Sequence, residues 1–146
     1  MGSRGSASGA GTAERTFAAR AKDLFKGTNT LAGYRDVIMG SRKADADKLA
    51  NDISDYYEKK AKKYGFKVER TGEGFNTSLA AEKTQNGKTV RVNPTLNNGG
   101  VGNFAIRVED PSYRKPGVRF QVSGRSRYFS NFDTAFRYAN KILNEN

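Results

Sequence analysis

The sequence predicts an α+β fold, with N-terminal helices followed by an antiparallel β-sheet packed against a C-terminal helix. The prediction rests mainly on the C-terminal part of the chain. There, the apolar residues Phe104, Ile106 and Val108 alternate with small or charged residues, as expected for a strand with one buried face. A second alternating run follows at 118–123, and residues 131–144 have the apolar spacing of an amphipathic helix.

A short third strand is predicted around Arg127–Phe129, after a tight turn at Ser123–Arg125. The helix that follows has a clear start, because Ser130 and Asp133 have the spacing of a capping box. We expect its apolar face to pack on the sheet. That face consists of Phe132, Ala135, Phe136, Ala139, Ile142 and Leu143.

The N-terminal region divides into two segments. Residues 1–12 are mostly Gly, Ser and Ala, with too few apolar side chains to fold, so we expect a disordered arm or the remainder of an expression vector. Residues 13–40 hold two short amphipathic helical patterns, at 13–26 and 29–39. Helices this short are unstable alone, so they must dock on the rest of the chain or on a partner.

Residues 41–146 form the predicted α+β domain, with a long helix over 42–64 and strands within 66–129. The long helix has an apolar stripe and four lysines near its C-terminus. Because cations are favoured at that end of a helix dipole, the cluster is explained without a ligand, and a ligand contact is the alternative. The four are Lys59, Lys60, Lys62 and Lys63.

A hairpin is predicted in the middle of the domain. The Asn86–Gly87 pair stands between two strand-like runs, which indicates a tight turn. In the second run Val90 and Val92 alternate with polar residues, so Arg91 belongs to the polar face. The glycine-rich segment 99–103 lacks the Gly-Lys-Ser/Thr of a phosphate-binding loop and precedes a strand, so we interpret it as a turn.

Composition narrows the function classes. The 146-residue chain has 26 Lys+Arg against 15 Asp+Glu and a formal net charge of +11, which favours a polyanionic or acidic partner. The absence of Cys and His excludes a zinc finger, a thiol nucleophile and a catalytic histidine. We therefore expect no enzyme activity, no catalytic residue, no cofactor and no metal site. No apolar stretch is long enough to span a bilayer, so we expect no membrane partner. The absence of Cys, and so of disulfides, suits a cytoplasmic protein. No small-molecule substrate is expected.

The basic sheet and its loops are the strongest functional signal. Arginine forks suit both guanine edges and phosphates, and a β-sheet face can enter the major groove. Tyr113, in the predicted loop DPSYRKPG, is a candidate for stacking on a base or sugar. The candidate residues for binding nucleic acid or another partner are Arg91, Arg107, Tyr113, Arg114, Lys115, Arg119, Arg125 and Arg127.

The stretch FAIRVEDPSYRKPGVRFQVSGRSRYFSNFDTAFRYANKI resembles the AP2-type and integrase N-terminal DNA-binding modules. The resemblance lies in the IRVEDPS and VRFQV strands and in the Phe129–Thr134 entry to a helix with spaced alanines. Those modules pack three antiparallel strands on one helix and read the major groove with the sheet face. The resemblance therefore implies that Arg107, Arg119 and Arg127 face the bases.

Two further resemblances are weaker. The order helix, strands, helix is similar to the double-stranded RNA-binding domain, but SNFDT stands where that family has lysines, and the strand region is longer. The leader GSRGSASG is similar to the Gly/Arg/Ser-rich starts of some bacteriophage-encoded proteins. We expect a basic, non-enzymatic nucleic-acid-binding protein that uses an arginine-bearing sheet face on duplex DNA. The alternative is a phage-type protein that binds another protein in the host cytoplasm, as a virion component or as an inhibitor of a host defence nuclease.

Overall fold

The computed structural model describes residues 9, 11–26, 31–95, 104–117 and 123–145. It confirms the predicted α+β class, with N-terminal helices, a five-stranded antiparallel sheet and a C-terminal helix. The helices are α2 (Thr12–Leu24), α3 (Leu31–Ile38), α4 (Lys43–Lys63), the short 3-10 helix η1 (Gly74–Asn76) and α5 (Phe132–Leu143). The strands are β1 (Lys67–Thr71), β2 (Ser78–Gln85), β3 (Lys88–Thr95), β4 (Ala105–Arg114) and β5 (Ser123–Phe129). Among the described helices, none is long and apolar enough to cross a membrane.

Three sequence predictions fall on residues outside this description. They are most of the N-terminal arm, the glycine-rich segment 99–103, and the alternating run at 118–122 with Arg119.

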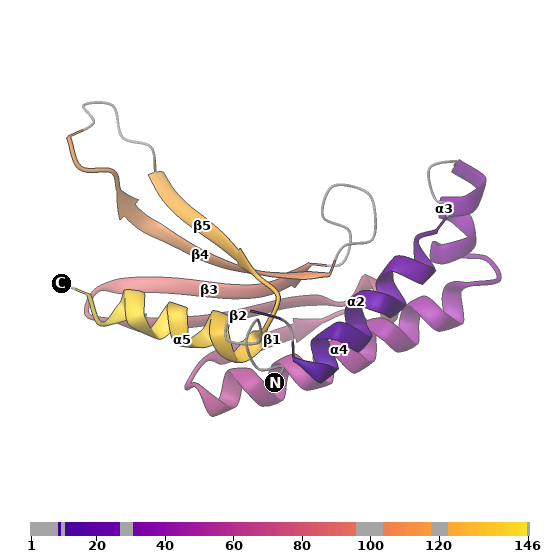
Figure 1. The fold of residues 1–146 in the computed structure, drawn as a ribbon, viewed down its shortest axis with the longest axis horizontal. Coiled ribbons are helices and arrows are strands. Elements are labelled where there is room, and N and C mark those ends of the chain that lie inside the picture. The colour runs from indigo at the N-terminus through magenta and orange to yellow at the C-terminus, as the bar shows by residue number, and fades with distance from the viewer. Residues whose placement is uncertain (1–8, 10, 27–30, 96–103, 118–122, 146) are drawn as a thin grey trace.

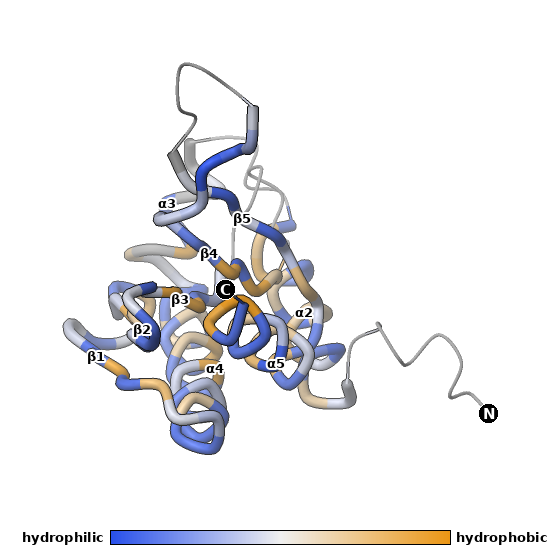
Figure 2. Tube along the Cα trace, turned by 90° about the vertical axis from the view of Figure 1, so that its left-hand side faces the viewer, coloured by the Kyte–Doolittle hydropathy of each residue, from blue (hydrophilic) through white to orange (hydrophobic). Residues whose placement is uncertain are grey.

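The sheet has the strand order β1-β2-β3-β4-β5, and each strand pairs antiparallel with its neighbours. Helices α4 and α5 lie along the same face of the sheet (Figures 1 and 2). The face opposite these two helices is called the open face below. This arrangement sends alternate side chains of each strand either into the core or onto the open face.

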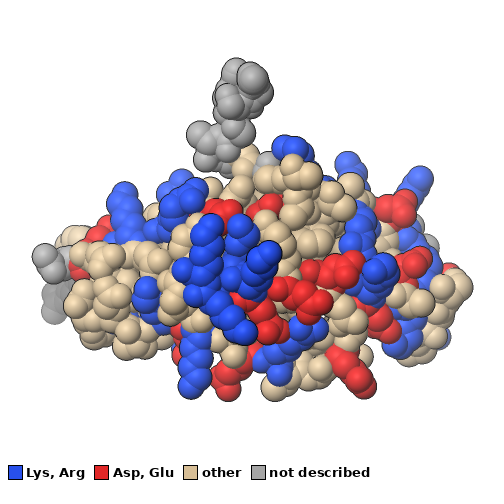
Figure 3. All heavy atoms as spheres, turned by 90° about the horizontal axis from the view of Figure 1, so that it is seen from below, with Lys and Arg blue, Asp and Glu red and all other residues tan. Residues whose placement is uncertain are grey.

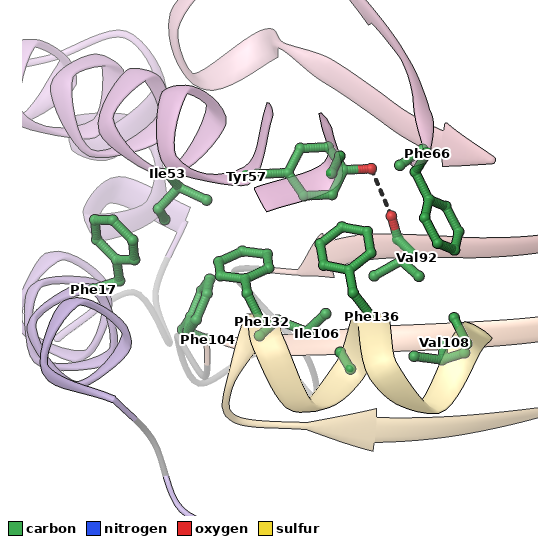
Figure 4. Packing of buried hydrophobic residues seen from close by; sticks show 14 of the residues in the cluster. Phe17, Ile53, Tyr57, Phe66, Val92, Phe104, Ile106, Val108, Phe132 and Phe136 are labelled. Carbon is green, nitrogen blue, oxygen red and sulfur yellow. Dashed lines mark hydrogen bonds between the residues drawn. The ribbon is translucent and has the colours of Figure 1, made fainter. Parts of the chain in front are cut away.

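The core lies between the two helices and the sheet (Figure 4). Phe132 and Phe136 of α5 and Tyr57 of α4 are fully buried against strand residues such as Val92 and Ile106. The Tyr57 hydroxyl donates a hydrogen bond to the Val92 carbonyl at 2.5 Å, and burial raises the pKa of this tyrosine. Each large side chain buried in this way contributes about 1.5–3 kcal/mol.

Helix α2 packs onto this core through one aromatic and one acidic side chain. The Phe17 ring lies 5.7 Å from the rings of Tyr56 and Phe104, edge-on to each. Glu14 is only 2% exposed, and its Oε2 accepts a hydrogen bond from the Phe132 backbone N–H at 2.7 Å. The first N–H groups of a helix have no partner within the helix, and its N-terminus favours acidic side chains. The Glu14 carboxylate is therefore well placed at the start of α5.

The α5 N-cap is Asn131, whose side chain accepts a hydrogen bond from the Thr134 backbone N–H at 3.1 Å. The predicted capping box of Ser130 and Asp133 is therefore wrong. Ser130 stands one residue before the N-cap position, and the Asp133 carboxylate turns toward α4 instead.

The predicted Asn86–Gly87 turn is confirmed. These two residues connect β2 to β3, with φ angles of 54° and 79°. Positive φ at both central positions is the geometry of a type I′ hairpin, which Asn-Gly adopts readily.

Two segments that we predicted as a loop and a turn are instead parts of strands. β4 continues through Asp110–Arg114, and β5 begins at Ser123, before the predicted short third strand. The pairing register shifts between Asp110 and Arg114, and Gly124 has φ +82°. This irregularity lets the ladder continue past Pro111, which has no N–H to donate. Where we predicted three strands, the described residues hold two, β4 and β5, which pair with each other, and β4 also pairs with β3 of a larger sheet.

Candidate nucleic-acid interface

The open face carries two of the predicted site residues, Arg91 and Arg107, and both lie beside carboxylates. Arg91 Nε is 2.6 Å from Glu82 Oε2, and its Nη1 is 3.8 Å from Glu109 Oε1. Arg107 Nη2 is 3.0 Å from Glu109 Oε2. The register produces the two Arg91 pairs, because Arg91 stands opposite Glu82 on β2 and opposite Glu109 on β4. Arg107 and Glu109 are two residues apart on β4 and so share its open face. The positive charge of both arginines is therefore largely balanced within the protein.

Arg107 nevertheless keeps one donor free. Its Nε is buried and has no hydrogen-bond partner among the described residues. The side chain lines a hollow of about 240 Å³ at the β4–β5 register shift, together with Glu109, Pro111 and Gly124. Because the Nε is buried, a partner would contact the terminal nitrogens of Arg107, whose side chain is 41% exposed. Tyr128, 48% exposed, stands opposite Arg107 on β5, and sequence reasoning missed it.

Arg125 is held by two carboxylates and an aromatic ring. Its Nε is 3.1 Å from the buried Asp110 carboxylate, and its Nη2 is 3.2 Å from Glu145. Burial would lower the pKa of Arg125, but the hydrogen bonds to Asp110 and Glu145 raise it. The guanidinium lies 4.5 Å from the centre of the Tyr113 ring. Tyr113 therefore already has one stacking partner.

Arg127 does not share a face with Arg107. It stands opposite Val108, whereas Arg107 stands opposite Tyr128, so the pleat directs Arg127 to the side of α5. Its guanidinium lies 5.1 Å from the ring centres of Phe129 and Tyr138. The AP2-type resemblance implied a base-facing Arg127 beside Arg107, and the register does not bring these two together.

The far end of the β4–β5 pair extends away from the helix layer (Figure 1). We call residues 110–115 and 123–127 the distal ribbon. Arg114 is exposed and, among the described residues, donates only to the backbone carbonyls of Pro111 and Tyr113, at 3.3 and 3.0 Å. Lys115 is also exposed. In the described part of the chain, no carboxylate lies within ion-pair distance of Arg114, Lys115 or Arg127.

A second group of cations lies on the helix side of the molecule, where Figure 3 shows Lys and Arg side chains gathered near the middle of the view. From the sequence, we explained the lysines of α4 by the helix dipole. The fold adds two exposed cations of α5, Arg137 and Lys141. They are four residues apart and therefore share one side of the helix, a spacing that sequence reasoning missed. We call this group the helical cationic patch. It consists of Lys59, Lys60, Lys62, Lys63, Arg137 and Lys141.

Asp133 connects the two helices beneath this patch. Its carboxylate is 3.0 Å from Lys60 Nζ and 3.7 Å from Lys63 Nζ, and it accepts a hydrogen bond from the Tyr64 hydroxyl at 2.7 Å. Arg137 in turn donates to the Tyr64 hydroxyl at 3.4 Å. Burial would raise the pKa of Asp133, but the hydrogen bonds from Tyr64 and Lys60 and the lysine charges lower it. Asp133 is therefore ionised at neutral pH and offsets part of the patch charge.

Within the described residues, no three His, Cys, Asp or Glu side chains come together in a way that could hold a metal ion. No protein-family model, curated protein or solved structure matches the chain. The interpretation of the candidate interface therefore depends on its geometry and charge.

Proposed function

We propose that this protein is a non-enzymatic nucleic-acid-binding protein that contacts duplex DNA through the distal ribbon. One observation carries the proposal. The far end of the ribbon projects beyond the helices and bears Arg114 and Lys115, neither of which has a carboxylate partner among the described residues (Figure 1). A cation that is not neutralised by its own protein retains its full attraction for phosphate.

The shape of the ribbon also fits this role. The major groove of B-DNA is about 12 Å wide and admits a two-stranded β-ribbon. In the proposed complex, Arg114 and Lys115 contact phosphates on either side of the groove and set the position of the ribbon. Arg107, whose side chain is 41% exposed, and the exposed Tyr128 lie along the same strand pair, where base contacts would form.

Fluorescence anisotropy with labelled duplex DNA, at several salt concentrations, tests the proposal. The ribbon variant combines Arg114→Gln and Lys115→Gln. Its matched control combines Lys22→Gln and Lys26→Gln, which removes the same charge from exposed positions near the end of α2. We expect the ribbon variant to bind about tenfold more weakly, with a salt slope lower by about two, and the control to resemble the wild type.

Equal weakening of the two variants would show that only net charge matters and would refute the ribbon as the contact. Single-stranded DNA and duplex RNA of the same length serve as competitors. Feeble wild-type binding to all three nucleic acids, even at low salt, would refute the nucleic-acid function and favour an acidic protein as the partner.

A further inference from the structure

The helical cationic patch lies on α4 and α5, whereas the far end of the distal ribbon, which bears Arg114 and Lys115, extends away from these helices (Figure 1). We propose that the patch is a second contact surface for duplex DNA, so that one molecule bridges two duplex segments. This inference rests on the proposed function of the ribbon.

Carboxylates of the protein balance only part of the positive charge of the patch. Asp133 lies against Lys60 and Lys63, and Lys63 keeps 61% of its side chain exposed. Across the described residues, Lys59, Lys62, Arg137 and Lys141 form no ion pair with a carboxylate. The patch is therefore a net positive surface, whereas the open face is largely balanced.

A neighbouring carboxylate of α4, that of Glu58, already has a cationic partner. Glu58, one residue before the patch begins, accepts from Arg70 at 2.8 Å, and the same Arg70 is 2.9 Å from Asp55. These acidic side chains are thus held toward β1 and do not neutralise the lysines of the last two turns of α4.

The chemistry of the two surfaces differs. The patch is mainly lysine, whose compact charge on a flexible stem suits phosphate contacts without base specificity. Its cations lie along two packed helices, which matches the extended line of phosphates on one duplex strand. The ribbon instead combines arginine with aromatic side chains and can enter a groove.

Geometry separates the two contacts. The far end of the ribbon points away from the helix layer that carries the patch (Figures 1 and 2). Because duplex DNA resists bending over such short lengths, one straight segment reaches only one of the two surfaces. Occupation of both surfaces therefore requires two segments.

A two-colour bridging assay tests the inference. Donor-labelled and acceptor-labelled short duplexes are mixed with the protein at near-physiological salt, and energy transfer reports their approach. Lys59→Gln, Lys62→Gln and Lys63→Gln form the patch variant, and glutamine retains helix propensity. Lys22→Gln, Lys26→Gln and Lys48→Gln form the control, which removes the same charge from exposed lysines elsewhere.

We expect energy transfer with the wild type and the control. The patch variant should lose most of it and still bind a single duplex within about threefold of wild type, because its ribbon is intact. The molar mass of the bridged complex, measured by light scattering, should correspond to one protein with two duplexes.

Three outcomes would overturn the inference. One is bridging by the patch variant at the wild-type level, and another is a bridged complex that contains two proteins. The third is wild-type binding to one duplex without energy transfer, which leaves the proposed function intact. Absence of any duplex binding by the wild type would instead refute the proposed function together with the bridging.

Discussion

The body of the sheet, meaning its strands outside the distal ribbon, and the ribbon itself belong to the same antiparallel sheet. They differ in whether their arginines are all paired with carboxylates. In the body, Arg70, Arg91 and Arg107 each lie within 3.0 Å of a carboxylate oxygen. In the ribbon, Arg125 is paired with Asp110 and Glu145, whereas Arg114 donates only to backbone carbonyls among the described residues. The difference teaches that pairing, and not the presence of arginine, decides which part of a basic sheet is available to a polyanion.

The two regions also differ in what stabilises them. The body is covered by α4 and α5, with a continuous aromatic core beneath it (Figure 4). The ribbon extends past that cover, and its Tyr113 packs on Arg125. Large stability effects are therefore expected in the body and small ones in the ribbon.

The largest expected effect is on stability and comes from Phe136→Ala. The ring is fully buried and contacts the rings of Tyr57, Tyr64, Phe66 and Phe132. We expect a loss of about 3–5 kcal/mol in the free energy of unfolding, measured by denaturant titration. Tyr113→Ala is the matched ribbon change and should cost much less. Equal costs for the two would erase the proposed distinction between body and ribbon.

Glu14→Ala should have the next largest effect, because α2 and α5 are joined through this buried carboxylate. Its removal leaves the Phe132 N–H without an acceptor, at a cost of about 1.5–3 kcal/mol by the same titration. Glu69→Ala, at an exposed position of β1, is the control and should be nearly neutral. A neutral Glu14→Ala would mean that water replaces the carboxylate at the start of α5.

The pH dependence of stability should include a contribution from Asp133. Its pKa in the folded state lies below the ordinary value of 3.8, because Tyr64, Lys60 and Lys63 favour the ionised form over the effect of burial. A lowered folded-state pKa means that the contribution is complete above pH 3.8 and is lost as the pH falls through the folded-state pKa. Thermal unfolding from pH 6 to pH 2 should therefore fall less steeply for Asp133→Asn than for the wild type. Parallel curves for the two proteins would contradict this assignment.

The smallest expected effect comes from Arg91→Gln on the open face. Exposed ion pairs contribute about 0.2–1 kcal/mol, and we expect a loss in this range. Affinity for duplex DNA should stay within about twofold of wild type, because Glu82 and Glu109 already balance this charge. A tenfold loss of affinity would move the contact surface from the ribbon back to the open face.

Local patterns predicted much of the fold. The alternation at Phe104, Ile106 and Val108 marked the buried side of β4, and Asn86–Gly87 marked the hairpin. The length of β4 could not be predicted, since Pro111 normally ends a strand and only the register shift with β5 accommodates it.

The candidate site was only partly predictable. Arg91 and Arg107 were placed on the polar face by their alternation, and the structure agrees with that placement. The carboxylate partners of Arg91 come from the neighbouring strands β2 and β4, so the pattern of its own strand contains no information about them. Glu109, the partner of Arg107, stands two residues along the same strand. The base-facing role of Arg127 followed from the resemblance alone, and its pairing opposite the buried Val108 places it on the α5 side.

The sequence by itself determined the α+β class, the spans of the long helices, the Asn-Gly hairpin and the excess of positive charge, because each depends on spacing or composition. Tertiary structure alone decided which cations are neutralised and which remain exposed. It also brought the α4 lysines beside Arg137 and separated them from the distal ribbon. The physical reason is that ion pairs join residues on different strands and helices, so they depend on register and packing.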